Sequence, residues 1–401
     1  MHLCHSRYQH RLVEILHSAI IVFDNNFMLV YQSCNYSQLE MEGDMRSNYK
    51  AGPSLGLTAV LLIGLSAYSY ADQTASSNYE PALNSLGHPD IQGVWDFRTL
   101  TPLERPAQMA DSKAIFTQEE AEAFRQQVVQ RNDVDNQRDI PAEFDVEGAY
   151  NSAWWDFGTT MTEDRRTSLI VDPSNGRLPA LTPETLLVLK ENDRRLPPVR
   201  DMASLGMSTF RPDGPESVGL SERCLAGFNA GPPLSPSAYN NNLRIVQTPD
   251  HVVLVTEMIH NARVVPMDGR PHLPKDLAEW SGDARGHWEG NTLVVETKNF
   301  TNKIPVFQLP FALDKPGKSG AVGFGKNFQL TERFTPVNES RLLYEYTIDD
   351  PTTFTQPFTV VIPMKASDNQ MFEYACHEGN YSMPGMLNGA RQAEKEELAA
   401  H

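Results

Sequence analysis

The chain has 401 residues, 28 prolines and a formal net charge of −17. Such an acidic surface repels phosphates and anionic lipids, and no basic run is present, so nucleic-acid binding is not expected. The length suffices for one large domain or two small ones with a buried core, and the many prolines favour loops over long helices.

The N-terminal region is typical of a secretory signal peptide spanning residues 45–71. A short positive head follows Met45, an apolar run covers 55–65, and small residues precede a cleavage site after Ala71. The run is shorter than the ~20 residues that a membrane-spanning helix needs. We therefore expect a periplasmic or secreted protein with no membrane contact after cleavage; the alternative is a retained membrane anchor.

Residues 1–44 precede this signal and are expected to be a translated leader, absent from the cellular protein. The codons for Met41-Glu42-Gly43 can contain a purine-rich stretch like a bacterial ribosome-binding site, just before the codon for Met45. Met45 is therefore the predicted start.

Cysteine usage follows from this prediction of export. Cys4 and Cys34 lie in the leader, which leaves Cys224 and Cys376 in the mature chain. An isolated pair in an oxidising compartment usually forms a disulfide, here closing a loop of about 150 residues. A free structural thiol, or a catalytic thiolate beside His377, are the alternatives.

The first part of the mature chain is expected to hold few regular elements. Residues 72–89 are predicted to be a disordered linker, and 90–240 a helical and loop-rich segment that packs on the main domain. Short strands are expected at 94–98 and 167–172. Helices are expected to start at two capping residues, Thr117 with Glu120 in a capping box, and Thr182 before Pro183.

Residues 241–385 are predicted to form a series of β-strands, because apolar and polar residues partly alternate along them. Turns are expected at 249–250, 289–291, 338–340 and 367–369, the last followed by a further strand. The predicted fold is mainly β: an antiparallel meander of ten to eleven strands, closed into a lipocalin-like barrel or a strongly curved sheet. N-terminal helices and long proline-rich loops are expected to surround this barrel or sheet. Residues 386–401 are expected to form a C-terminal helix or tail.

Two groups of residues are candidates for proton transfer. Glu257 and His260 lie with Arg263 between two predicted strands, and His377 and Glu378 follow the last one. A carboxylate and an imidazole can exchange a proton, and an arginine can hold an anion. A rim salt bridge, or a turn with polar side chains, is the structural alternative.

Further polar residues are candidates for substrate binding. His272 lies in a loop that could fold over the barrel mouth, and the stretch after it mixes aromatic and charged side chains, as aromatic-ligand sites often do. Arg333 and Glu345 face each other across one predicted hairpin, on a face that either meets solvent or lines a cavity. The members of the mixed stretch are Trp280, Asp283, Arg285, His287 and Trp288.

No cofactor or metal is predicted. The mature histidines show no paired zinc-ligand spacing, although distant histidines could still assemble a site, and the sequence has no phosphate loop, dinucleotide fingerprint or nucleophile elbow.

Several stretches together resemble a broad family of secreted bacterial proteins: "RRTSLIVDPSNGRLPALT", "GHWEGNTLVVETKNF" and "YEYACHEGNY" among them. The resemblance covers most of residues 90–392 and implies export, but it implies no activity. The Gly-x-Trp opening at 93–95 is similar to that of lipocalin-type barrels.

These features predict a pocket that binds or transforms a small hydrophobic or aromatic molecule. As an enzyme, the protein would be a cofactor-independent lyase, isomerase or hydrolase. His260 or His377 would act as base with Glu257 or Glu378 as partner, and Arg263 or Arg285 would hold an oxyanion. The alternative is a non-catalytic ligand-binding protein of the cell envelope. The sequence does not indicate an oligomeric state.

Overall fold

The computed structural model describes residues 79–106, 109, 113–132, 156–187, 212–217, 223–225, 227, 229–301, 307–308, 321–322, 325 and 327–400. All of these lie in the second of the two units into which the chain divides, Ala67–His401. The predicted leader, signal peptide and cleavage site lie outside the described residues.

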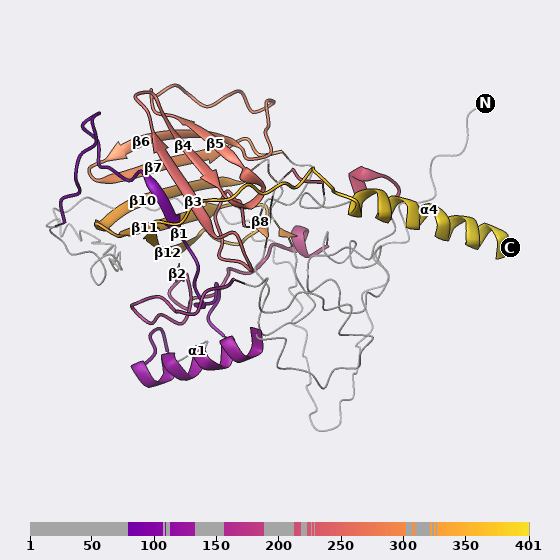
Figure 1. Ribbon diagram of the computed structural model, residues 1–401, viewed down its shortest axis with the longest axis horizontal. Coiled ribbons are helices and arrows are strands. Elements are labelled where there is room, and N and C mark those ends of the chain that lie inside the picture. Colours follow the sequence, from indigo (N-terminus) through magenta and orange to yellow (C-terminus); the bar gives the residue numbers. More distant parts are fainter. Residues whose placement is uncertain are drawn as a thin grey trace, which may run out of the picture. The chain divides into compact units, whose positions relative to one another are not determined.

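A ten-stranded antiparallel sheet dominates the described part of the chain (Figure 1). The strands are β1 (Gly93–Asp96), β2 (Ile170–Asp172), β3 (Asn242–Gln247), β4 (His251–Thr256), β5 (Ala262–Pro266), β6 (Asp283–Glu289), β7 (Thr292–Lys298), β10 (Gln329–Asn338), β11 (Arg341–Asp349) and β12 (Phe358–Ser367). A separate two-stranded sheet pairs β8 (Phe307–Gln308) with β9 (Ala321–Val322). The mainly β prediction is thus confirmed.

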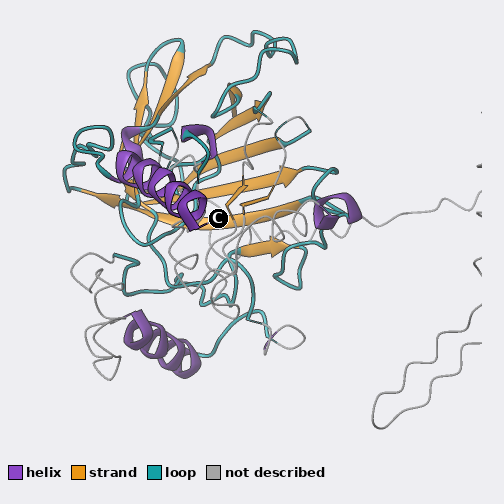
Figure 2. Cartoon of the chain, turned by 90° about the vertical axis from the view of Figure 1, so that its right-hand side faces the viewer, coloured by secondary structure: helices purple, strands orange, loops and turns teal. Residues whose placement is uncertain are grey.

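Three of the four predicted turns, at 249–250, 289–291 and 338–340, join paired strands, but the strand order is not a plain meander. The order is β5-β4-β3-β1-β12-β11-β10-β7-β6, with β2 paired to β12 outside this path. The N-terminal β1 lies between β12 and β3 and pairs with both. Figure 2 shows the strands as a twisted sheet, from steep strands at the upper left to nearly horizontal ones across the middle.

The sheet is not closed into a barrel by hydrogen bonds, because no ladder joins β5 to β6 among the described strands. The two strands nevertheless lie against each other. A Cβ atom at Gly286 of β6 would stand 2.8 Å from Val265 Cγ1 and 2.5 Å from Met267 Sδ. The glycine therefore lets the segment that includes the end of β5 pack directly on β6.

The predicted strand after residue 369 is absent, and residues 370–375 form no strand. Its place beside β12 is already taken, since Trp95 of β1 pairs with Ala366. The displaced segment is partly exposed, with Phe372 exposing 74% of its surface. The chain end instead forms helix α4 (Ser382–Ala400), which begins four residues earlier than the predicted 386–401 element.

Both predicted N-terminal helices are present. In α1 (Gln118–Asn132) the capping box forms as expected, because Glu120 Oε2 accepts from Thr117 N at 2.8 Å and Thr117 Oγ1 accepts from Glu120 N at 3.2 Å. The hydrogen bond from Lys113, followed by the one from Thr117, lowers the pKa of Glu120. Thr182 accepts from Thr185 N before a helical stretch at 183–187.

The described part of the predicted linker, residues 79–89, contains turns and backbone hydrogen bonds, and residues 72–78 lie outside the described residues. Asn84 Oδ1 accepts from the backbone amides of Leu86 and His88, and Leu83 pairs with Pro89. Gln247, at the end of β3, donates to Pro89 O at 3.0 Å. This segment therefore leads directly into β1.

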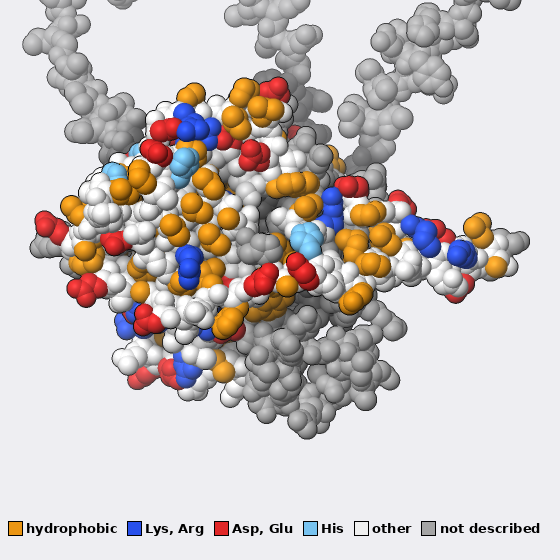
Figure 3. Space-filling view, turned by 45° about the horizontal axis from the view of Figure 1, so that its top comes forward, with side chains coloured by type: hydrophobic (Ala, Val, Ile, Leu, Met, Phe, Trp, Pro, Cys, Tyr) orange, Lys and Arg blue, Asp and Glu red, His pale blue; other side chains and the backbone are white. Residues whose placement is uncertain are grey.

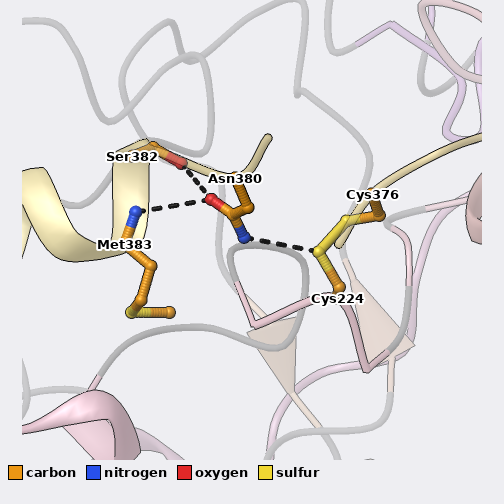
Figure 4. Close-up of a disulfide and its surroundings, with 5 residues drawn as sticks. All are labelled: Cys224, Cys376, Asn380, Ser382 and Met383. Carbon is orange, nitrogen blue, oxygen red and sulfur yellow. Dashed lines mark hydrogen bonds between the residues drawn. A yellow bond between two sulfur atoms is a disulfide. The ribbon is translucent and has the colours of Figure 1, made fainter. Parts of the chain in front are cut away.

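The predicted disulfide between Cys224 and Cys376 is confirmed, across a sequence separation of 152 residues (Figure 4). Asn380 Nδ2 donates to Cys224 Sγ at 3.5 Å, while Asn380 Oδ1 accepts from Ser382 Oγ and Met383 N at the start of α4. The bridge is thereby linked to the N-terminus of the C-terminal helix. Cys376 also packs on the small buried cluster of Ala230, Met258 and Ile259.

Candidate active site

The candidate site lies where β6 begins, beside the segment 267–273 that follows β5. Gly282 precedes Asp283, the first residue of β6, at a φ of +69°. A Cβ atom on Gly282 would stand 2.7 Å from Thr297 Cγ2 and 2.9 Å from Lys298 O, so only glycine fits there. This close approach fixes the position of Asp283 at the end of the sheet.

The buried carboxylate of Asp283 accepts hydrogen bonds from three groups. Arg285 NH1 donates to Oδ1 at 2.5 Å, while Leu273 N donates to Oδ2 at 2.8 Å. His272 Nδ1 lies 3.0 Å from the same Oδ2. Because an arginine and a backbone amide can only donate, both carboxylate oxygens act as acceptors here.

This arrangement selects one form of the neutral His272 ring. Nδ1 must carry the proton that bonds to Asp283, which leaves the lone pair on Nε2. Among the described residues, this buried Nε2 atom has no hydrogen-bond partner. A histidine oriented by a carboxylate, with its other nitrogen unpaired, is the arrangement of a general base.

Arg285 is held by backbone carbonyls as well as by Asp283. Its Nε and NH2 donate to the carbonyls of Arg270 and Pro271 at 3.0–3.2 Å, and NH1 donates to Ala284 O at 2.6 Å. The side chain is only 14% exposed. These contacts give the guanidinium a structural position rather than the oxyanion-holding position predicted from the sequence.

The loop 273–282 beside the dyad carries exposed apolar side chains: Leu273, Leu277 and Trp280. It is tied to the end of β7, since Asn299 Nδ2 donates to Leu273 O at 2.8 Å and Glu279 N donates to Asn299 O at 3.0 Å. Hydrophobic side chains also reach the surface in several small groups on the face drawn in Figure 3. The loop that follows His272 in the chain therefore offers exposed apolar surface.

A second polar cluster lies inside the core, on the inner face of the sheet. Arg263 of β5 forms a bidentate ion pair with Glu332 of β10, at 2.6 and 2.9 Å, with both side chains buried. Tyr344 donates to Glu332 Oε1 at 2.8 Å and accepts from Leu234 N at 3.1 Å. The cluster connects strands from distant parts of the sheet order.

Electrostatics in this cluster favour the charged pair. Burial lowers the pKa of Arg263, but the charge and hydrogen bonds of Glu332 more than offset this, so its pKa is raised. Burial, followed by the negative charge of Glu332, raises the pKa of Tyr344 well above its usual range. Burial likewise raises the pKa of Tyr346. Both tyrosines therefore stay neutral beside the ion pair.

Among the predicted proton-transfer residues whose side chains are described, no contact joins Glu257, His377 and Glu378. Glu257 is buried and accepts from Asn242 Nδ2 at 2.6 Å, not from Arg263. His260 ends the 3-10 helix η6 (Met258–His260), and its side chain lies outside the described part. His377 and Glu378 are exposed in the turn after the disulfide.

Among the remaining predicted residues, His287, Arg333 and Glu345 lie on the outer face of the sheet, whereas Trp288 packs against the core. Arg333 pairs with Glu289 at 2.8 Å and stands 4.0 Å from Glu345, as the hairpin register predicted. Glu289 also binds exposed His287. Burial raises the pKa of Glu345, while Arg333 opposes this shift. The residues of the predicted mixed aromatic and charged stretch therefore do not form one group, and the Trp288 ring stacks on the His88 ring.

Sequence reasoning selected His272, Asp283 and Arg285, but it did not pair them. It missed Glu332, Tyr344 and Tyr346 altogether. The alternation of buried and exposed positions along β10 and β11 could have identified these three residues. They point to the same face of the sheet as the buried Leu330 and Phe334.

Within the described ranges, no group of three or more His, Cys, Asp or Glu side chains is arranged to hold a metal ion. No helix in the same ranges is both long and apolar enough to cross a membrane. Comparisons of the chain with protein-family models, curated proteins and solved structures found no match. The resemblance to a family of secreted bacterial proteins therefore stays a prediction.

Proposed function

We propose that the protein binds a small, neutral hydrophobic or aromatic molecule and transfers a proton at His272, as a cofactor-independent lyase or isomerase. One observation carries this proposal: His272 Nδ1 is committed to Asp283, while its buried Nε2 has no partner among the described residues. The exposed apolar side chains of the adjoining loop supply the contact area for the ligand.

In this mechanism Nε2 removes a proton from the bound molecule, and the imidazolium that forms is stabilised by Asp283. Asp283 keeps its charge throughout, because Arg285 and Leu273 N continue to donate to it. Since Nε2 is shielded from solvent, the substrate is admitted by movement of the exposed residues 274–278, between the two points at which the loop is tied to the end of β7.

The architecture that belongs to this proposal is a lipocalin-like barrel. The packing of Val265 and Met267 against Gly286 brings the two edges of the sheet together and supports such closure. The site then lies at one end of the β5–β6 seam.

Export also belongs to the proposal, with a periplasmic or secreted location. The disulfide supports it, because such bridges persist in oxidising compartments. Fractionation of the producing cells is expected to recover the protein from the periplasm or medium with an oxidised Cys224–Cys376 pair, whereas recovery from the cytoplasm with both thiols free would contradict export.

The test uses elimination of 5-nitrobenzisoxazole, a neutral aromatic compound that reports proton removal by a base. The base takes the ring C–H proton, the N–O bond breaks, and its electron pair stays on the oxygen of a coloured nitrophenolate. His272→Ala is expected to lower the rate by about 10²-fold or more, the usual contribution of a general base.

His287→Ala is the matched control, because His287 also pairs with a carboxylate, at 3.1 Å, but lies exposed on the same strand as Asp283. Its rate should equal that of the wild type. Equal rates in both variants, with both proteins folded, would overturn the proposal.

Binding without turnover is the second candidate function, favoured by the exposed Leu273, Leu277 and Trp280. If the protein only binds, the neutral fluorescent probe N-phenyl-1-naphthylamine should bind the wild type and His272→Ala equally well. Neither of the two proteins should then catalyse the elimination of 5-nitrobenzisoxazole.

A further inference from the structure

We infer that Arg285 is a positioning residue that sets the tautomer of His272. The inference deepens the proposed function and rests on it. Arg285 has no described contact with the His272 ring, so it would act through Asp283 and through the backbone that carries the ring.

The first link is the carboxylate. Arg285 NH1 holds Oδ1 of Asp283 at 2.5 Å, which fixes the rotation of the carboxylate about its Cβ–Cγ bond. Oδ2 is then turned toward His272 Nδ1 and Leu273 N. Without the guanidinium, the carboxylate can rotate about this bond. Its hydrogen bond to His272 Nδ1 then competes with hydrogen bonds to other donors, including water.

The second link is the backbone. Arg285 Nε donates to the carbonyls of Arg270 and Pro271, and NH2 donates to Pro271 O. These two residues immediately precede His272. One side chain therefore holds both members of the dyad, the carboxylate directly and the histidine through the peptide groups before it.

The planar guanidinium suits this task, because its donors point in fixed directions and reach several acceptors at once. A lysine at the same position could hold the carboxylate but not the two carbonyls as well. Outer partners that orient metal-binding histidines change metal affinity or activity by roughly 10–100-fold when removed, and we expect an effect of similar size here. The contact with Ala284 O further fixes the guanidinium over its own strand.

The experiment uses the full chain with nitrogen-15-labelled histidines, and the signals of His272 are assigned by their loss in His272→Gln. In the wild type, Nδ1 is expected to be the protonated nitrogen of the neutral ring. Arg285→Ala is expected to show a mixture with the Nε2–H form and a roughly 10–100-fold slower elimination of 5-nitrobenzisoxazole. Arg285→Lys should lie between the two.

Arg333→Ala is the control, because Arg333 also pairs with a carboxylate of β6, Glu289, but at the opposite end of the strand from Asp283. It should leave the His272 signals unchanged. If Arg285→Ala and Arg285→Lys both keep the pure Nδ1–H form, the inference is overturned.

The two readouts separate the inference from the proposed function. A wild type that shows no elimination but loses its single tautomer in Arg285→Ala contradicts the proposed function and keeps the positioning role. If Arg285→Ala does not fold, Arg285→Lys decides the question by its tautomer alone.

Discussion

Replacing Glu332 with alanine is expected to destabilise the folded chain by about 3–5 kcal/mol, the usual cost of leaving one partner of a buried ion pair alone. The guanidinium of Arg263 would stay in the core without its bidentate acceptor, and Tyr344 would lose the oxygen to which it donates. The free energy of unfolding, measured by urea titration, checks this value.

Two variants make the measurement specific. The double variant Arg263→Met/Glu332→Leu removes both charges and should be close to neutral or even stabilising. Glu345→Ala, on the outer face of the same hairpin, should cost at most about 1 kcal/mol. If Glu332→Ala costs no more than Glu345→Ala, the ion pair does not brace the core.

Loss of the disulfide is expected to cost about 5 kcal/mol in the chain-entropy model, because the bridge joins cysteines 152 residues apart. The double variant Cys224→Ser/Cys376→Ser removes it. Asn380 would lose its contact with Cys224 at the same time, so amides at the start of α4 should exchange faster with solvent.

Urea titrations with and without reductant provide the check. Reductant should lower the stability of the wild type to that of the double variant and leave the double variant unchanged. A wild type that is equally stable under both conditions would show that the bridge contributes nothing.

The strands and their turns could be predicted because the signals are local. The turn at 289–291 joins β6 to β7, and that at 338–340 joins β10 to β11, as the breaks in apolar alternation indicated. The bridge could be predicted because only two cysteines remain in the predicted mature chain. The turns can be predicted from residues that are neighbours in the sequence, and the disulfide from the number of cysteines.

The cross-sheet contacts could not be predicted in the same way. Arg263 and Glu332 are 69 residues apart, and their meeting depends on β1 entering between β12 and β3, which sets the order of every other strand. The prediction instead singled out Arg333, one residue along, which faces outward. Parity with Leu330 and Phe334 would have placed Glu332 inside.

The candidate site was predicted in composition but not in geometry. His272 and Asp283 are 11 residues apart in a loop whose path depends on Gly282 and Gly286, where packing is too close for a side chain. The alternation of apolar and polar residues does not predict the path of such a loop. The same limit explains why Arg285 was expected to hold an anion, although the carbonyls of residues 270 and 271 fill its donors.

The most direct test of the His272–Asp283 site is the nitrogen-15 spectrum of His272 in the intact, ligand-free wild type. At a pH where the ring is neutral, Nδ1 is expected to be protonated and bonded to Asp283, and Nε2 to be unprotonated and unbonded. An Nε2–H tautomer, or the averaged signals of a freely exchanging histidine, would contradict this orientation of the ring.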